Sequence, residues 1–309
     1  MSNSLNDLGE DALVARLIRD LPSREDVIQG PGDDCAVIRP EQDPTGENLT
    51  PPTDLLFKTD AVVEGVHYLA KELPERVGAK ALKRAISDIA AMGGHPEHAL
   101  ITVALRGDVT IEYVDALYKG LGQTAERFGI SIVGGETVGL PAGAPNLISV
   151  SLTGTVIRGG AIFRSGGSVG DWIFVTGRLG GSLMSEWHLD FEPRLEEANW
   201  LRETLRPTAM MDLSDGLAKD LPRLAGQSGT GWQIDPARLP LHDGCSAQAG
   251  LGDGEDYELL FTIDPRQTDE TWTTHWQNVF PKLELTHIGE LTVPTTREGL
   301  DPSEGWDHF

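Results

Sequence analysis

Acidic residues in glycine-rich segments are the feature of this sequence with the clearest chemical meaning. They fall where strands are expected to end, at Asp33, Asp34, Asp60, Asp88, Glu136, Asp212, Asp215, Asp253, Glu255 and Asp256. Glycine lets a backbone approach a ligand closely and adopts positive φ without strain. Anions gathered in one cleft need cations, and Mg²⁺ binds through a few carboxylates, several waters and substrate phosphates. The pattern therefore predicts phosphoryl transfer from a metal-bound nucleotide.

The usual nucleotide-binding signatures are missing from the sequence. It has no Gly-Lys pair, which excludes a P-loop, and neither a G-x-G-x-x-G segment nor the H-R-D and D-F-G elements of protein kinases. Residues 166–170 match the hydrolase G-x-S-x-G pattern, but a turn is expected before the serine and a strand after it, so we reject that interpretation. Acids such as Glu196 and Glu203 fall on expected helix faces and are interpreted as solvating charges.

Hydrophobic periodicity predicts the elements that position these acids. Helices are expected over 10–21, 78–92 and 111–127, and strands over 55–59, 100–105, 130–133, 147–157, 171–176 and 257–263. A further helix is expected after Gly216, with Pro222 indicating a kink or a restart. Residues 43–53 are expected to form a loop. This mixture predicts an α/β or α+β fold, with a domain boundary in the glycine-rich stretch 158–168.

Composition limits the class of protein. The 309 residues are enough for two domains, predicted as 1–157 and 158–309. With 48 acidic and 25 basic side chains, the net charge of −23 argues against binding to nucleic acid. No apolar run is long enough for a membrane helix, the first ten residues are too polar for a signal peptide, and two distant cysteines exclude a disulfide scaffold. A cytoplasmic protein is expected.

Six segments in order resemble one family, the thiamine-monophosphate kinases. They are Gly32–Ala36, Thr59–His67, Ser87–Gly93, Gly134–Thr137, Met211–Leu217 and Gly254–Leu259. The family's superfamily includes aminoimidazole ribonucleotide synthetase, selenophosphate synthetase and a hydrogenase-maturation protein. The resemblance extends from Leu8 to Phe309. It implies an N-terminal ATP- and Mg²⁺-binding domain that forms a dimeric sheet or barrel, a C-terminal α/β domain that completes the active site, and a homodimer.

The resemblance also implies the reaction and the site residues. The reaction is ATP-dependent phosphorylation of thiamine monophosphate to thiamine diphosphate, assisted by several Mg²⁺ ions. The implied metal ligands are Asp33, Thr59, Asp60, Asp88, Glu136, Asp212 and Asp215. Nucleotide contacts are implied for Gly135, Glu136, Arg164, Ser214 and Tyr118, and substrate contacts for His67, Glu255, Asp256 and Trp306. Asp88, Asp212 and Arg164 are the expected catalytic residues.

Two residues depart from the family pattern. Lys58 replaces a small hydroxyl residue and cannot ligate Mg²⁺, and Glu136 stands where aspartate is commoner. These departures leave open a noncatalytic Mg²⁺-nucleotide-binding regulatory protein, and within the superfamily the alternative is another ATP-using synthetase. Trp306 could pack on the core rather than on substrate, and His67 could be satisfied by the backbone.

Overall fold

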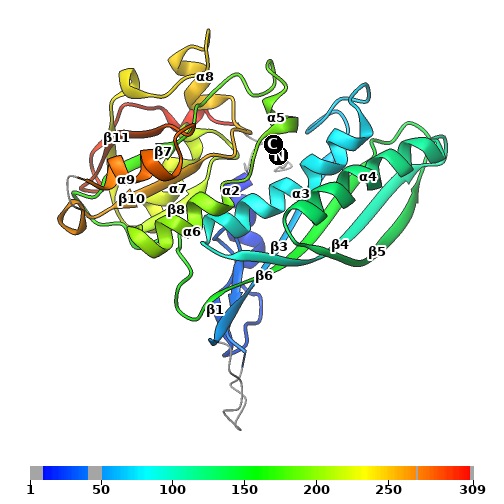
Figure 1. Cartoon of the computed structure of the whole chain (residues 1–309), viewed down its shortest axis with the longest axis horizontal. Coiled ribbons are helices and arrows are strands. Elements are labelled where there is room, and N and C mark those ends of the chain that lie inside the picture. Colours follow the sequence, from blue (N-terminus) through cyan, green and yellow to red (C-terminus); the bar gives the residue numbers. More distant parts are fainter. Residues whose placement is uncertain (1–9, 41–50, 269–270, 307–309) are drawn as a thin grey trace, which may run out of the picture.

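The computed structural model describes residues 10–40, 51–268 and 271–306, which form two lobes around two six-stranded sheets (Figure 1). In the first sheet the strand order is β1-β2-β3-β6-β4-β5. The strands are β1 (Val27–Gln29), β2 (Ala36–Ile38), β3 (Thr53–Val63), β4 (His95–Arg106), β5 (Ser131–Leu140) and β6 (Leu147–Ile157). The pairs are antiparallel except for β4 with β5. This sheet is open in the single chain, since β1 and β5 are its two edges among the described residues.

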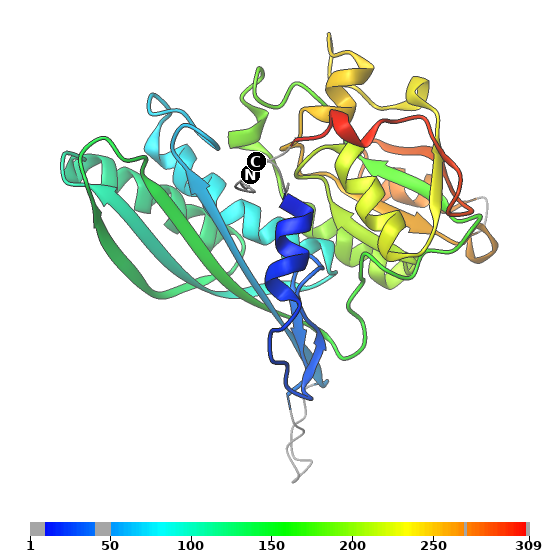
Figure 2. The same ribbon diagram turned by 180° about the vertical axis from the view of Figure 1, so that it is seen from behind.

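Two helices cover one face of this sheet, α3 (Pro74–Ala91) directly and α4 (Ile111–Arg127) beside it. Leu82, Ile86 and Ile89 of α3 are fully buried in a core shared with Leu117 and Leu121 of α4 and with the strands. In the part of the chain that the structure describes, no helix covers the opposite face of the sheet over β3, β6, β4 and β5 (Figure 2).

The second sheet has the order β12-β9-β11-β7-β10-β8. Its strands are β7 (Trp172–Thr176), β8 (Ala209–Asp212), β9 (Gly231–Ile234), β10 (Leu259–Ile263), β11 (Leu285–Thr292) and β12 (Arg297–Glu298). Helices α7 (Leu217–Gln227) and α8 (Ala247–Gly252) pack on one face, and α6 (Leu195–Thr204) and α9 (Trp272–Val279) pack on the other. Short helices α2 (Glu10–Ile18) and α5 (Trp187–Asp190) and three 3₁₀ turns at Pro236–Arg238, Pro265–Gln267 and Pro302–Glu304 complete the fold.

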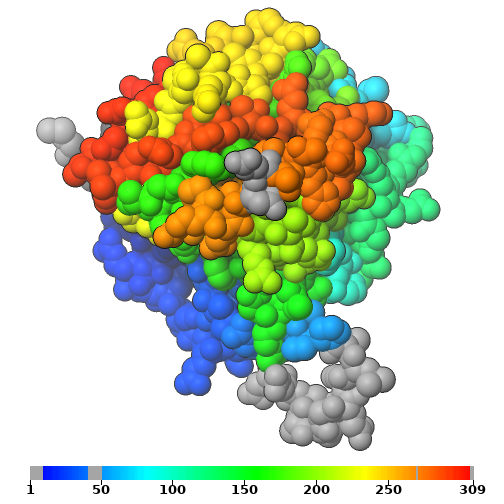
Figure 3. All heavy atoms as spheres, turned by 60° about the vertical axis from the view of Figure 1, so that its left-hand side comes forward, coloured from blue at the N-terminus to red at the C-terminus, as the bar shows by residue number. Residues whose placement is uncertain are grey.

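Helix α3 joins the two lobes. Its middle belongs to the first core, while Ala90 and Ala91 at its end pack with Leu201 of α6 and Met210 of β8 in the second lobe. The space-filling view shows the C-terminal half, yellow to red, resting on the blue and cyan N-terminal segments (Figure 3). Polar residues of α3 therefore lie where the two lobes meet.

The mixed α/β class is confirmed, but three expected strands are longer than the sequence suggested, among them β4, which begins at His95. Strand β3 continues to Val63, so Asp60 lies inside a strand and not at its end. Strand β5 continues through Gly134–Thr137, which the sequence assigned to a glycine-rich loop. A Cβ on Gly135 would lie 1.8 Å from the carbonyl oxygen of Ile101, so glycine there permits close strand pairing. Helix α7 runs through Pro222 without a restart. The loop expected over 43–53 falls mostly outside the described residues.

Close packing of α3 on α4 depends on glycine, and this gives a first prediction. A Cβ on Gly120 would lie 1.9 Å from the carbonyl oxygen of Glu75, a backbone atom that cannot turn aside. Gly120→Ala should therefore cost about 3 kcal/mol of unfolding free energy, measured by urea denaturation. Gly122→Ala is the control in the same helix, because a Cβ there meets nothing within 4 Å, and it should be neutral or stabilising. Equal effects of the two substitutions would contradict the packing argument.

Candidate active site

Three buried carboxylates converge between the lobes. Asp34 precedes β2, Asp88 is in the last turn of α3, and Asp212 ends β8. One oxygen of each lies within 4.8 Å of the others, and the residues are 2, 6 and 3 % exposed, respectively. Helix α3 and the two strands thus bring together acids from three distant parts of the chain.

Burial and mutual repulsion make this cluster unfavourable as three free anions. Burial, with the charge of Asp34, raises the pKa of Asp212 to about 6. Burial also raises the pKa of Asp88, against the opposing effect of Lys58. Oxygen Oδ2 of Asp34 is buried and has no hydrogen-bond partner among the described residues. A hard cation with oxygen ligands would satisfy all three residues, so the donor set fits Mg²⁺.

Two side-chain cations contact the cluster in this structure. Lys58 Nζ lies 2.6 Å from Asp88 Oδ1. Arg164 Nε donates to Asp34 Oδ1 at 3.1 Å, and its backbone N–H donates to Asp33 at 3.2 Å. Burial and the charge of Asp34 raise the pKa of Asp33 to about 6. Lys58, identified from the sequence as unable to ligate Mg²⁺, therefore forms an ion pair with Asp88 and neutralises its charge.

Asp88 and Asp212 of the cluster, with both cations, line an open cleft of about 450 Å³, and Asp34 lies behind its wall. Its lining includes Asp33, Lys58, Asp60, Arg84, Asp88, Arg164, Asp212, Ser214, Asp215, Arg223 and Tyr257, together with one face of α2. Of the expected metal ligands, five are therefore in one cleft: Asp33, Asp60, Asp88, Asp212 and Asp215. Arg164 and Ser214, expected at the nucleotide, lie there too.

The loop between β8 and α7 is shaped by one buried acid. Asp220 accepts hydrogen bonds from the backbone N–H groups of Ser214 and Asp215, both at 3.0 Å. Gly216 has φ +93°, a conformation that favours glycine. Arg223 Nη1 lies 2.5 Å from Asp215 Oδ2. Asp215 is thereby held at the cleft with a cation already beside it.

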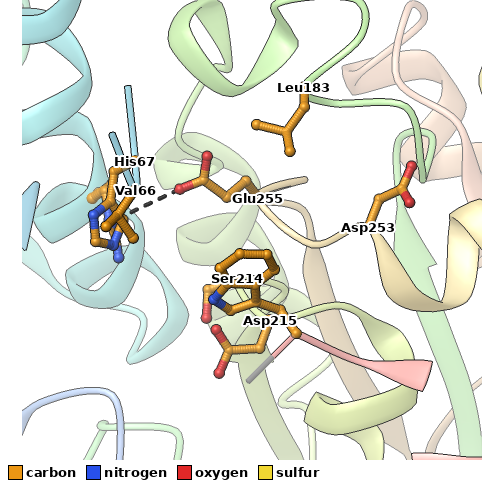
Figure 4. A pocket seen from close by; sticks show the side chains of 9 residues that line it. Val66, His67, Leu183, Ser214, Asp215, Asp253 and Glu255 are labelled. Carbon is orange, nitrogen blue, oxygen red and sulfur yellow. Dashed lines mark ion pairs between the residues drawn. The ribbon is translucent and has the colours of Figure 1, made fainter. Parts of the chain in front are cut away.

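A second pocket adjoins the cleft (Figure 4). It is lined by Val66, His67, Arg84, Leu183, Ser214, Asp215, Asp253, Glu255 and Trp306. Trp306 is 44 % exposed, so it does not pack in the core. Its backbone N–H donates to the Asp215 carbonyl at 2.9 Å, which fixes the C-terminal segment against the β8–α7 loop. Three of the four expected substrate residues, His67, Glu255 and Trp306, therefore share this pocket.

Lys80 of α3 organises the His67 side of this pocket. Its side chain is fully buried, and Nζ donates to the His67 carbonyl at 2.6 Å and to Glu255 Oε2 at 2.5 Å. The Val63 N–H donates to His67 Nδ1 at 3.1 Å. Burial, with the nearby charge of Arg84, lowers the pKa of His67 to about 4, so the ring is neutral at pH 7. The backbone therefore satisfies one ring nitrogen of His67, as the alternative interpretation expected, and the residue also lines the pocket.

Other expected site residues lie elsewhere. Along β3 the side chains alternate, so Thr59 faces away from Asp60, and its Oγ1 lies 3.3 Å from Ser151 Oγ on the open face of the sheet. Glu136 pairs with Thr102 on that same face, and its Oε1 accepts from the Thr137 N–H at 2.7 Å. The structure thus separates these two expected metal ligands from the carboxylate cluster.

Three more expected residues lie outside both pockets. Gly135 is in β5, and Tyr118 is a 39 % exposed side chain of α4. Asp256 is 1 % exposed and accepts from the Gly180 N–H at 2.9 Å, which places it beneath the loop rather than in the pocket. In the single chain these three residues line neither the cleft nor the second pocket, although Asp256 lies between Glu255 and Tyr257, which do.

The sequence reasoning missed several cations. Lys80 and Arg84, like Arg84 and Asp88, are four residues apart on α3, so all three share one helix face. That spacing could have assigned them to the site along with Asp88. Ser87 was also missed; its Oγ donates to Asp212 Oδ2 at 2.5 Å. Asp34 was noted as an acid but not as a ligand.

The raised pKa of Asp212 predicts a dependence of stability on pH. Between about pH 4 and 6 the folded state holds a proton that the unfolded state has released, so the stability that this group contributes falls as pH rises. Without divalent metal, the unfolding free energy of the wild type minus that of Asp212→Asn should fall by up to about 3 kcal/mol from pH 4 to 7. Urea denaturation with a chelator measures it. Asp115→Asn, on the exposed face of α4, should show no such trend.

Comparison with known proteins first gives the class. The family "AIR synthase related protein, N-terminal domain" matches residues 32–156, which comprise the strands and both helices of the first lobe from the acidic loop at Asp33 onward. This agrees with the superfamily expected from the six segments.

The wider comparisons give the family. A thiamine-monophosphate kinase of Rhodopirellula baltica is 33 % identical over 90 % of this chain and 86 % of its own length. The Aquifex aeolicus enzyme is 33 % identical over 99 % of both chains. A solved structure of AaThiL complexed with AMPPCP and TMP matches all of both chains with a TM-score of 0.81 and 30 % identity. The chain belongs to the thiamine-monophosphate kinase family, and the resemblance predicted from its sequence is confirmed.

Among the described residues, no helix is long and apolar enough to cross a membrane.

Proposed function

We propose that this chain is a phosphotransferase that transfers the terminal phosphate of ATP to the phosphate of thiamine monophosphate, giving thiamine diphosphate and ADP. The observation that carries the proposal is the cleft itself, in which a buried cluster of three carboxylates adjoins a pocket walled by Trp306. The curated relatives carry this activity as their name, and the structural neighbour holds AMPPCP and TMP.

The reaction needs no conventional base. The attacking atom is a phosphate oxygen of the acceptor, which is largely ionised near neutrality because its second pKa is about 6. A bond forms from this oxygen to the terminal phosphorus of ATP, the bond from that phosphorus to the bridging oxygen breaks, and ADP leaves with the electron pair. Positioning and charge cancellation carry the catalysis.

The residues of the cleft are assigned to these tasks. Asp33, Asp34, Asp88 and Asp212 would hold Mg²⁺, which supplies charge neutralisation and orientation of the phosphates when bound. Arg164 presents a guanidinium beside Asp34, where it can contact the transferring phosphate. Trp306 can stack on the acceptor's cationic thiazolium ring. Asp60, Asp215 and Ser214 line the same cleft and complete the proposed metal and nucleotide contacts.

The open face of the first sheet is proposed as the homodimer interface. Phe57, Leu100, Val138 and Ile157 are 42–49 % exposed on this face, an apolar surface of the kind that interfaces bury. Thr59 and Glu136 share it, so their proposed role as Mg²⁺ ligands belongs to this side of the sheet. Gly135 in β5 and Tyr118 on α4, which covers the other face, are kept as proposed nucleotide contacts. Sedimentation should give a dimer for the wild type and a monomer for Leu100→Glu; a monomeric wild type would refute the interface.

Two further assignments from the sequence are kept as proposals. The domains are 1–157, which holds the first sheet, and 158–309, which holds the second. The enzyme is proposed to act in the cytoplasm.

The decisive experiment separates this function from its alternatives. The purified protein is incubated with Mg²⁺, ATP and thiamine monophosphate, and thiamine diphosphate and ADP are quantified by chromatography. Equimolar products are expected. Nucleotide binding without product would favour the regulatory alternative, and ATP turnover only with other phosphorylatable substrates would favour the synthetase alternative.

A further inference from the structure

The two pockets meet at three residues. Arg84, Ser214 and Asp215 each line both the carboxylate cleft and the Trp306 pocket, and Arg84 is the one cation among the described residues that does so. A substrate with its ring system beside Trp306 and its reacting group at the cleft must pass this junction.

Arg84 is held rigidly at the junction. Its Nε donates to Asp60 Oδ2 at 3.1 Å, and its Nη1 lies 3.5 Å from Glu255 Oε1, the ion pair drawn in Figure 4. The guanidinium also lies over the ring of Tyr257, at 6.0 Å from its centre. The side chain is 12 % exposed. Contacts from β3, the Glu255 loop and Tyr257 thus fix the plane of the guanidinium.

Most of the donor capacity of Arg84 is unused. A guanidinium has five N–H donors, and among the described residues only the Nε–H makes a hydrogen bond. Nη1 is buried with no hydrogen-bond partner. A positioned arginine with free donors suits a phosphate, which accepts two parallel hydrogen bonds from the guanidinium fork.

The junction also needs a cation for electrostatic reasons. Asp60, Asp215 and Glu255 surround the passage, and these carboxylates repel a phosphate dianion. Lys80 is turned away, because its ammonium is fully buried against Glu255 and the His67 carbonyl. Lys58, Arg164 and Arg223 contact carboxylates on the cleft side and do not line the Trp306 pocket. Arg84 is therefore the residue placed to offset this repulsion where the acceptor phosphate arrives.

We propose that Arg84 binds the phosphate of thiamine monophosphate at this junction and thereby makes the enzyme select phosphorylated thiamine over thiamine. The inference rests on the proposed function, since it takes the acceptor to be a thiamine phosphate ester. It assigns a specificity-determining role to a residue that lies outside the six segments of the family resemblance, three positions before Ser87.

A purely structural role for Arg84 makes a different prediction. If the guanidinium only tied Asp60 to Glu255, its loss would loosen the pocket for every ligand. Thiamine and thiamine monophosphate would then lose affinity together. If it binds the phosphate, only the phosphorylated ligand loses affinity. The ratio of the two dissociation constants separates the roles without any catalytic measurement.

The experiment is isothermal titration of the full-length protein in Mg²⁺, with thiamine and then with thiamine monophosphate. Arg84→Gln should weaken thiamine monophosphate binding about 10- to 100-fold and leave thiamine within about two-fold. Arg84→Lys keeps the charge but not the forked pair of N–H donors, so its affinity for thiamine monophosphate should lie between those of the wild type and Arg84→Gln. Lys83→Gln is the matched control, because it removes the same charge at the next position of α3, outside both pockets, and it should leave both affinities unchanged.

The outcomes are distinct. Equal weakening of both ligands by Arg84→Gln, or no weakening of either, would overturn the assignment, and circular dichroism of each variant shows whether it is folded. Should Arg84→Gln fail to fold, Arg84→Lys decides by the same ratio. A wild type that selects thiamine monophosphate through Arg84 but forms no thiamine diphosphate would refute the proposed reaction and leave the phosphate subsite standing.

Discussion

Asp88→Asn should lower kcat by at least about 10³-fold while the protein remains folded. Asp88 is the member of the carboxylate cluster that both Lys58 and the neighbouring acids contact, so it lies at the centre of the charges that must cancel when two phosphates meet. An amide keeps the shape of the side chain but loses the charge, and it is a poor ligand for a hard cation. The loss should therefore appear in turnover rather than in folding.

The folded state should tolerate Asp88→Asn because the cluster holds surplus negative charge. Asp34, Asp88 and Asp212 lie within 4.8 Å of one another, so removing one anion relieves repulsion between the other two. This relief offsets the loss of the ion pair with Lys58. Steady-state kinetics with saturating Mg²⁺, and melting temperatures without it, test both statements. Asp115→Asn on the exposed side of α4 should leave kcat unchanged. Activity of Asp88→Asn within a few-fold of the wild type would contradict the role assigned to Asp88.

The sequence predicted the chemistry of the cleft better than the ends of the strands that form it. Helix periodicity placed the helix of 111–127 correctly, because α4 has one apolar face and a Thr110 cap that accepts from the Tyr113 N–H at 3.2 Å. The sequence ended the strand at Thr59, because alternation is interrupted there by Lys58 and Asp60. Lys58 and Asp60 both face the cleft from inside β3. In the sequence such a pair of polar residues is typical of a loop, so the strand was expected to end there.

Partners that meet only after folding could not be predicted from the sequence. Asp212 lies 125 positions from Ser87, and Lys80 lies 175 positions from Glu255, so no local pattern indicates either contact. The position of Thr59 and Glu136 on the open face of the first sheet likewise follows from strand register. A one-residue shift in register would move each of them to the other face. The resemblance to the kinase family indicated the site residues. The fold then places most of them at the cleft and the second pocket, and places Thr59 and Glu136 on the open face of the first sheet.

Lys58→Met should destabilise the metal-free protein by about 3 kcal/mol at neutral pH, whereas Asp88→Asn should leave its stability nearly unchanged. Lys58 Nζ lies 2.6 Å from Asp88 Oδ1, and both side chains are largely buried, at 22 and 8 % exposure. Removing the ammonium leaves Asp88 beside Asp34 and Asp212 with no adjacent cation, so the carboxyl must remain an unpaired buried anion or take up a proton, and either costs stability. Lys119→Met is the matched control. Its ammonium also lies 2.6 Å from a carboxylate, that of Glu75, but both groups are exposed, so its loss should cost less than about 1 kcal/mol.

The charge argument for Lys58 has further consequences that packing alone would not produce. Lys58→Met/Asp88→Asn should recover most of the lost stability, because the unpaired anion is gone, and the double-mutant cycle measures the coupling. The deficit of Lys58→Met should shrink as pH falls toward 4. Burial already raises the pKa of Asp88, and without the opposing effect of Lys58 that carboxyl takes up its proton at still higher pH. Mg²⁺ should raise the melting temperature of Lys58→Met more than that of the wild type, since a divalent ion can replace the missing ammonium beside Asp88. A deficit that is independent of pH, Mg²⁺ and Asp88 would show that Lys58 acts through its packing, and not as the internal counter-ion of the cluster.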